Sequence, residues 1–238
     1  MKFQSQSMAI GLAIAFAMAL ALSVALICLS HAKQDLPPLP DTGANTESTE
    51  AAHGGAHGTD TQPPPTVSTE NGLRFTSNGN GTCFLSGIGE WTDACVVIPE
   101  FSPMGDRVTE IAPMALFECK TVTAIQIPAS VERIGDLAFA ACPNLAYISV
   151  SDANPYFCDT DGVLYNADRS MLILYPAMRA GSTVAISNAT SKIADMAFYN
   201  CRNLTRVSFD GTPAQWESIA IGSQNYSLTA AAKTFTEA

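Results

Sequence analysis

The side chains best suited to acid–base or nucleophilic chemistry lie near the start of this chain. The sequence of 238 residues has three histidines, His31, His53 and His57, and all of them precede Asn71. A Ser/His/Asp or Cys/His arrangement is therefore excluded from residues 72–238, because each needs an imidazole beside the nucleophile. His53 and His57 lie four residues apart, a spacing that would align two metal ligands on a helix. The glycines of HGGAHG disfavour a helix, so we interpret this segment as a flexible tract.

The carboxylates Asp159 and Asp161 are the other candidates for chemistry. They stand in the segment DTDG, where Asp and Gly are favoured in turns for backbone reasons. We therefore interpret DTDG as a turn, with a weak Ca²⁺ site and glycosidase-type chemistry as the alternatives. DTDGVLYNAD lacks the ligand spacing and the terminal glutamate of an EF-hand loop, and the chain has no GxxxxGK[ST] phosphate loop. The sequence predicts no enzyme, no metal and no cofactor.

Seven cysteines offer thiol chemistry, and their spacing favours a structural role for most of them. Cys119, Cys142 and Cys201 recur at one position of a repeat, which predicts a buried row of reduced thiols that act as small hydrophobic side chains. Cys83 and Cys95 lie on either side of a GIG turn, where a disulfide can close, and Cys158 is then left either free or paired elsewhere. Cys28 is a weak candidate for lipid attachment, because the bulky Ile27 precedes it.

An internal repeat determines how all these residues are positioned. The segments VTEIAPMALFECKTVTAIQI, VERIGDLAFAACPNLAYISV and TSKIADMAFYNCRNLTRVSF begin at Val108, Val131 and Thr190. Ile111, Ile134 and Ile193 recur in phase with the three repeated cysteines. Each unit is too short to bury its own apolar face and must stack on its neighbours. The repeat predicts a β-rich α+β solenoid, with parallel strands and with a short helical turn around 137–141 and its equivalents.

Alternation within the second strand of each repeat separates an inward face from an outward face. Ile125, Ile148 and Val207 should point inward, whereas Gln126, Tyr147 and Arg206 should point outward. The second and third repeats are 59 residues apart instead of 23, and VLY and MLILY flank the turn signal NADRS in the excess. This pattern predicts an inserted β-hairpin. VAISNA supplies a further strand, so we expect four stacked strands.

The unmatched segments at both ends of the repeats should cap the stack. The opening piece should form short strands broken by NGNG and GIG. The final piece should fold over the open end through apolar side chains without repeat partners. These are Trp216, Ile219, Ile221 and Leu228.

The start of the chain has the composition of a targeting segment and a linker. Met8 to Leu29 is an unbroken apolar run, long enough to span a bilayer of ~30 Å but also typical of a secretory signal. The tract that follows is rich in Pro, Thr and Gly and should be disordered. The domains we predict are a signal peptide or signal anchor (1–32), a linker (33–71) and a repeat domain (72–238). Within the repeat domain we expect an N-cap (72–107), repeats (108–150), the hairpin insert (151–182), a repeat (183–209) and a C-cap (210–238).

The acidic charge of the chain argues against nucleic acid as a partner. The formal net charge is −10, and residues from Gly72 onward contain 10 Lys plus Arg against 16 Asp plus Glu. A surface of this sign repels phosphate backbones.

The repeats resemble the BspA-type leucine-rich repeat. IGDLAFAACPNLAYISV and IADMAFYNCRNLTRVSF carry the resemblance, and VVIPEF, NPYF to DGVLY to LILYP, and GTPAQWESIAIGS look like elements of bacterial cell-surface members. It covers about residues 72–232. The resemblance implies a right-handed leucine-rich repeat solenoid, exported to the cell surface, with a role in adhesion in some members. Pro113 and Leu116 depart from the family pattern, which favours a polar residue and Phe there.

Two hypotheses for the function follow. The first is a non-enzymatic binding module, cell-surface or secreted, that contacts a protein or cell-surface ligand through the solenoid. Its candidate binding residues are Gln126, Tyr147 and Arg206 on the strand face and Tyr156, Phe157 and Tyr165 in the insert. The alternative for the insert aromatics is that they pack inward and hold the hairpin against the solenoid. The second hypothesis is a structural or assembly component of the cell envelope, held at the membrane by residues 8–29.

Overall fold

A computed structural model describes residues 66–68, 72–89 and 91–236 of the chain. The predicted signal or anchor and most of the predicted linker lie outside these residues. Strand β1 (Thr66–Ser68) pairs with β2 (Arg74–Ser77), so at least this strand of the fold lies inside the segment that the sequence assigned to the linker. No helix among the described residues is long and apolar enough to cross a membrane.

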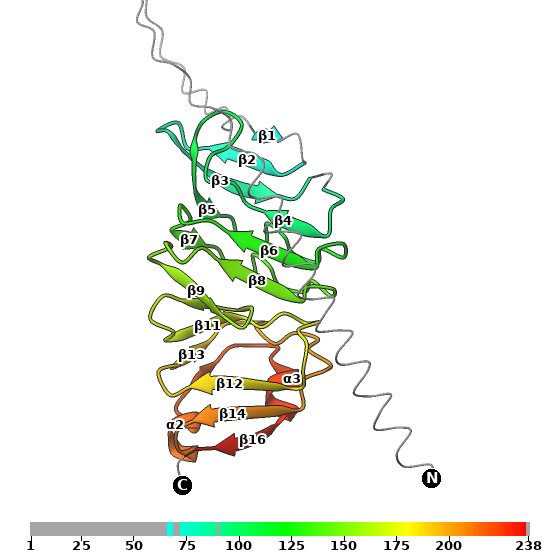
Figure 1. Ribbon diagram of the computed structural model, residues 1–238, viewed down its shortest axis with the longest axis vertical. Coiled ribbons are helices and arrows are strands. Elements are labelled where there is room, and N and C mark those ends of the chain that lie inside the picture. The colour runs from blue at the N-terminus through cyan, green and yellow to red at the C-terminus, as the bar shows by residue number, and fades with distance from the viewer. Residues whose placement is uncertain (1–65, 69–71, 90, 237–238) are drawn as a thin grey trace, which may run out of the picture.

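Each repeat adds one strand to each of two sides of the stack. The first repeat provides β5 (Arg107–Ile111) and β6 (Ala124–Ile127), the second β7 (Arg133–Ile134) and β8 (Tyr147–Val150), and the third β13 (Lys192–Ile193) and β14 (Arg206–Asp210). One side holds two five-stranded sheets, with the orders β1-β2-β3-β5-β7 and β15-β13-β11-β10-β9. The other side holds two three-stranded sheets, β4-β6-β8 and β12-β14-β16, and the elements follow one another along the long axis (Figure 1). The predicted solenoid is confirmed.

The remaining strands come from the caps and the insert. They are β3 (Thr82–Gly87), β4 (Cys95–Val97), β9 (Phe157–Thr160), β10 (Val163–Asn166), β11 (Met171–Leu174), β12 (Thr183–Ser187), β15 (Ala220–Ile221) and β16 (Ala232–Phe235).

The inward and outward faces of the strands follow the predicted alternation. Ile125, Ile148 and Val207 are fully buried at equivalent positions of β6, β8 and β14. Val150 and Phe209 are buried in the same phase. Ala124 is an exception, because it occupies an outward position of β6, two residues before Gln126, but is only 4% exposed.

The segments between the two strands of each repeat are hydrogen-bonded turns, not the helical turns that the sequence predicted. Each turn contains two non-glycine residues with positive φ, four residues apart. The pairs are Met114 and Glu118, Leu137 and Ala141, and Met196 and Asn200, all with φ between 55° and 58°. A left-handed residue reverses the local curvature, so a helix cannot propagate through the segment.

The insert is more than the hairpin that the sequence predicted. Strands β10 and β11 do form an antiparallel hairpin, but β9 pairs with the other edge of β10, and β11 pairs in parallel with β13. The insert therefore supplies a strand to the stack of repeats. Four strands were expected in one row; the structure instead has two sheets of three, because β4 and β16 from the caps join them and the insert separates them.

The insert also divides the apolar interior into two cores. Side chains alternate along β10, so that Leu164 belongs to the core of the first two repeats and Val163 and Tyr165 belong to the core of the third. In β11, Leu174 belongs to the first core and Leu172 to the second. The insert is a wall shared by both cores, which explains why β10 is buried on both faces.

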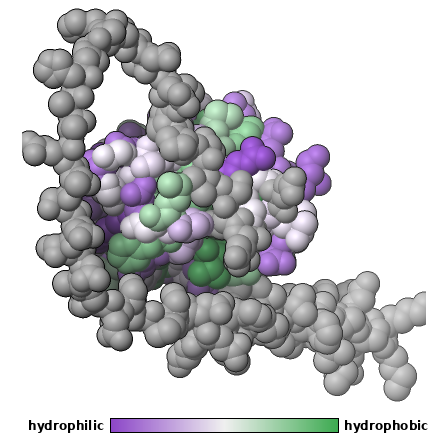
Figure 2. Space-filling view, turned by 90° about the horizontal axis from the view of Figure 1, so that it is seen from above, coloured by the Kyte–Doolittle hydropathy of each residue, from purple (hydrophilic) through white to green (hydrophobic). Residues whose placement is uncertain are grey.

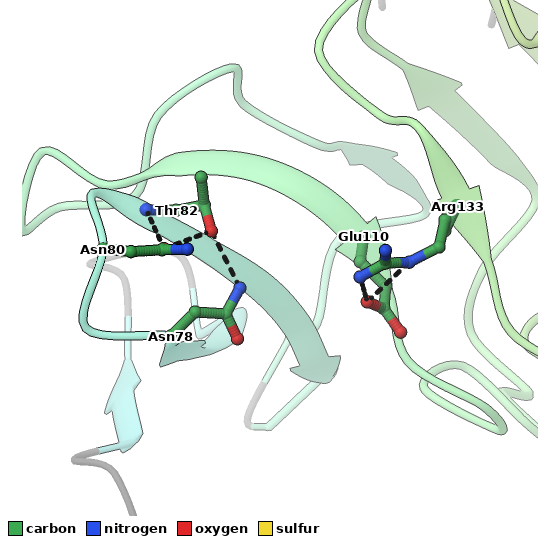
Figure 3. A network of polar contacts seen from close by, with 5 residues as sticks. All are labelled: Asn78, Asn80, Thr82, Glu110 and Arg133. Carbon is green, nitrogen blue, oxygen red and sulfur yellow. Dashed lines mark hydrogen bonds and ion pairs between the residues drawn. The ribbon is translucent and has the colours of Figure 1, made fainter.

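The N-terminal cap starts with a hairpin held by its own polar side chains. The NGNG turn between β2 and β3 is closed by Asn80, whose Oδ1 accepts hydrogen bonds from the Thr82 N–H and hydroxyl at 3.1 and 2.7 Å. Figure 3 shows this turn beside the Glu110–Arg133 ion pair, which joins directly opposed residues of β5 and β7. Seen end-on from this cap, small apolar areas lie among polar ones (Figure 2).

The C-terminal cap extends the stack by one more turn instead of only covering it. β15 pairs in parallel with β13, and β16 pairs in parallel with β14. Helix α2 (Pro213–Glu217) starts at a capping box formed by Thr212 and Gln215, and helix α3 (Tyr226–Ala230) follows β15. Ile219 and Leu228 are buried as expected, but Ile221 is 36% exposed, because β15 ends at the surface.

Candidate interaction surface

The outward side chains of the two three-stranded sheets form a surface that we call the strand face. On the first sheet, the register aligns Ala124 with Tyr147 and Gln126 with Ser149. On the second sheet, it aligns Thr183, Arg206 and Ala232 in one row and Ala185, Ser208 and Thr234 in the next. Parallel pairing keeps equivalent side chains about 4.8 Å apart along each row. The strand face is therefore regular and mostly small and polar.

The three predicted residues of the strand face lie on two different sheets. Gln126 and Tyr147 belong to the first sheet, whereas Arg206 belongs to the second. The insert lies between these sheets (Figure 1). A partner that contacts Tyr147 and Arg206 together must reach across the junction.

Tyr147 is half-buried against the insert and does not project freely. The two-residue turn Asp161–Gly162, which connects β9 to β10, has φ values of 51° and 80°, as a hairpin turn of the Asp-Gly type requires. A Cβ on Gly162 would lie only 2.5 Å from Cδ2 of Tyr147, so the tyrosine ring lies against the glycine. Burial raises the pKa of the Tyr147 hydroxyl, and the nearby Asp159 and Asp161 raise it further.

The insert aromatics differ in how much of each is available to a partner. Tyr165 is 4% exposed, and its burial raises the pKa of its hydroxyl to about 12. Phe157 is half-buried and packs against the first core, whereas Tyr156 is 47% exposed. Tyr165 is thus a core residue and Phe157 mainly a packing residue, which leaves Tyr156 as the insert aromatic open to solvent.

The carboxylates of DTDG have structural contacts. The Asp159 carboxylate accepts a hydrogen bond from the Val150 backbone N–H at 2.8 Å, and so covers the edge of β8. Asp161 occupies the hairpin turn, as the sequence indicated. Among the described residues, no three His, Cys, Asp or Glu side chains lie close enough together to hold a metal ion.

The cysteines make structural contacts that the sequence predicted only in part. The thiols of Cys142 and Cys201 are buried and donate to equivalent carbonyls, Leu116 O at 2.9 Å and Tyr175 O at 3.6 Å. Burial raises the pKa of Cys201 to about 12, which keeps the thiol protonated and unreactive. Cys119 is only half-buried, so the expected row of three buried thiols is wrong at this position. The possible Cys83–Cys95 bridge is not formed, because Cys83 is a free thiol buried in the first core.

Two residues that the sequence did not single out fix the insert in place. The Arg179 Nε donates to the Asp161 carbonyl at 2.9 Å, and its guanidinium lies 5.6 Å from the centre of the Tyr175 ring. Asn154 is buried and binds four backbone groups on both sides of the junction. The signal for Asn154 is the NPYF segment, where a polar residue stands just before the first strand of the insert, β9.

The chain was compared with family models, with curated proteins and with solved structures. A family model, the BspA type leucine rich repeat region, matches residues 96–159 and 179–231 in six copies. A leucine-rich repeat protein from Bacteroides ovatus is 25% identical over 60% of this chain and 42% of that chain, with a TM-score of 0.41. One from Bacteroides capillosus is 20% identical over 73% and 98% of the two chains, with a TM-score of 0.36. A leucine rich cell surface protein from Faecalibacterium prausnitzii is 16% identical over 68% and 73%, with a TM-score of 0.34. None of the curated proteins matches the sequence.

Proposed function

The repeats of this chain belong to the BspA-type leucine-rich repeat family, and on that premise we propose that the protein is a non-enzymatic protein-interaction module. The observation that carries this proposal is the strand face. It presents rows of short polar side chains on two rigid parallel sheets, with outward positions set by the repeat. Such a surface can form many contacts with a protein while its own backbone stays fixed.

The chemistry of the described residues supports binding over catalysis. The sequence from Gly72 onward contains no histidine. The buried thiols of Cys142 and Cys201 have raised pKa values, and the Asp159 carboxylate is bound to backbone. These groups hold the fold together, so the side chains left for a partner are those of the surface.

Arg206 is the charged residue of the strand face that we expect to contribute most to the free energy of partner binding. Arg206 is exposed at the centre of the second sheet, between Thr183 and Ala232. Exposed arginines are frequent hot spots when a partner covers them, because the planar guanidinium forms several hydrogen bonds at once. We therefore assign Arg206 the leading role and Gln126 a peripheral one.

Substitution of Arg206 by alanine is expected to weaken partner binding by about 30-fold, which corresponds to the ~2 kcal/mol of a hot spot. Affinity for a partner captured from extracellular-matrix or cell-envelope fractions would be measured by surface plasmon resonance on the full chain. Arg107→Ala is the matched control, because Arg107 is an exposed arginine at the start of β5 on the other side of the stack. Equal affinities of the two variants would remove the strand face from consideration.

For Tyr147, stability must be measured as well as affinity, because its ring lies against Gly162. Tyr147→Ala is expected to lower the thermal melting temperature as well as the affinity, whereas Arg206→Ala should leave the melt unchanged. A lowered melting temperature with unchanged affinity in Tyr147→Ala would identify Tyr147 as a support of the insert and not as a contact residue.

The proposed location is the cell surface or the extracellular space, with export directed by residues 8–29. If that run is retained it anchors the chain, and the protein would then act as an envelope component instead of a released binder. Full-length chain in the membrane fraction would support the anchored form, and a shortened chain in the medium the released form.

A further inference from the structure

In the first and third repeats, two backbone N–H groups of the turn form hydrogen bonds with the next turn. The equivalent N–H groups of the second repeat form no such bonds among the described residues. In the first repeat, the N–H groups of Met114 and Leu116 donate to Asp136 O and Ala138 O of the next turn, at 3.1 and 2.7 Å. In the third repeat, the N–H groups of Met196 and Phe198 donate at 2.9 and 2.8 Å to Ser223 O and the side chain of Asn225. The bonds join each turn to the one stacked upon it.

The equivalent donors in the second repeat are the N–H groups of Leu137 and Phe139. Within the described part of the chain, neither of them donates to any group. Strand β7 of the same repeat pairs with β5 on one side and has no described strand on the other. Residues 133–139 therefore form an open backbone edge, because no further turn is stacked on this part of the second repeat.

The insert explains why this turn is missing. The segment after β11 is shorter than a full repeat turn, and Tyr175 N already donates onward to Ala197 O at 2.9 Å. No carbonyl of the insert reaches back to Leu137 or Phe139. The space between the second repeat and β11 is instead an open groove of about 640 Å³.

The groove has an apolar lining and acidic residues at its surface. Leu137, Phe157, Ile173 and Ile221 are among the apolar residues that line it. Asp136 and Asp195 also line it and are exposed, and Lys192 is the basic residue among the lining side chains. The groove therefore carries an excess of negative charge, within a chain whose formal charge is −10.

We propose that this groove binds an extended peptide segment of a partner protein, with apolar side chains and at least one basic residue. The main-chain carbonyls of the peptide accept hydrogen bonds from Leu137 and Phe139, as the carbonyls of a stacked turn do elsewhere in the solenoid. The alternate spacing of these two donors matches the carbonyls on one edge of an extended chain. The apolar side chains cover the lining, and the basic residue lies beside Asp136 or Asp195. This groove is on the opposite side of the stack from the strand face, so the proposal is independent of the proposed function.

The test uses the full chain and a fluorescent peptide, acetyl-Lys-Val-Val-Val-Lys-amide, followed by fluorescence anisotropy. Saturable binding is expected, and Leu137→Asn should weaken it at least tenfold by removing part of the apolar lining. Asparagine tolerates the left-handed backbone that Leu137 adopts, so the variant keeps the fold. Met114→Asn is the matched control, because Met114 has the same conformation in the first repeat but lies outside the groove.

Two further measurements separate the parts of the proposal. Asp136→Asn should weaken the lysine peptide several-fold and leave acetyl-Ser-Val-Val-Val-Ser-amide unchanged. Amide hydrogen exchange should show that the lysine peptide protects the N–H groups of Leu137 and Phe139. Absence of saturable binding, equal binding by Leu137→Asn and Met114→Asn, or peptide binding that leaves both N–H groups unprotected would each overturn the proposal. Displacement of a second copy or of the chain's own N-terminal segment by the peptide would overturn it as well, because the occupant would not be a partner.

Discussion

Replacing Asn154 by alanine is expected to lower the free energy of unfolding by about 3 kcal/mol. The Asn154 amide donates to Pro128 O and Val131 O at 2.8 and 2.9 Å, and its carbonyl accepts from Tyr156 N and Phe157 N at 2.8 and 2.9 Å. Each bond contributes on the order of 1 kcal/mol, and the loss leaves buried backbone groups without partners. Because these bonds join the second repeat to the insert, the two cores of the variant should also unfold in separate transitions.

Asn144→Ala is the control for this variant. Asn144 makes the same kind of bond, from its side-chain amide to Lys120 O, but it is a single bond at an exposed site. Its loss should cost less than about 1 kcal/mol, because water replaces the partner. Urea denaturation of both variants gives the comparison. A similar loss in both would mean that Asn154 does not hold the insert, and a single unfolding transition in Asn154→Ala would mean that the two cores unfold together.

Replacing Gly135 by alanine is expected to destabilise the protein by about 3 kcal/mol as well, for a steric reason. A Cβ at this position would lie 2.6 Å from Cδ and 2.7 Å from Cα of Pro113, in the neighbouring turn. The proline ring and backbone cannot rotate away, so the two stacked turns must separate. The equivalent residues of the other repeats are Ala112 and Ala194, so the repeat pattern alone would predict that alanine is tolerated.

Gly87→Ala is the matched control for the steric argument. Gly87 also has an ordinary backbone conformation, and the nearest atom to its added Cβ would be Ala115 O at 3.9 Å. Alanine there should be neutral or slightly stabilising, because it restricts the unfolded chain. The test is the thermal melting temperature of both variants. If Gly135→Ala has the same melting temperature as the wild type, the contact with Pro113 is not a tight one.

The parts of the fold that depend on phase could be predicted from the sequence. The buried positions Ile111 and Ile193 and the strands around Ile125, Ile148 and Val207 recur at a fixed spacing, and stacking forces equivalent residues into equivalent environments. Cys142 and Cys201 followed the same logic. Cys119 did not, because it belongs to an early repeat whose turn is more open to solvent.

The role of the insert could not be read from the repeat, because its segments share no sequence with it. Its parallel pairing with β13 places Leu172 opposite Ile193, 21 residues away and close to the repeat spacing of 23. This spacing is a signal that the sequence contained, but it is one pair of apolar residues among many. The burial of Tyr165 was equally hidden, since it follows from the position of β10 between two cores.

For the candidate surfaces, the sequence could predict which side chains point outward but not what those side chains contact. Alternation placed Gln126 and Arg206 outward, yet it could not show that Tyr147 lies against Gly162 in the insert. The groove was not predictable at all. It arises from the length of the segment after β11, which leaves the second repeat without a stacked turn.

Native-state hydrogen exchange of individual amides tests directly whether the insert interrupts the stack at the second repeat. The N–H groups of Leu116 and Phe198 are bonded across turns and should exchange slowly, close to the global unfolding limit. Those of Leu137 and Phe139, at the equivalent positions, should exchange at least a hundred-fold faster in the free protein. Equal protection at all four amides would contradict this interruption, because it would mean that a turn is stacked on the second repeat.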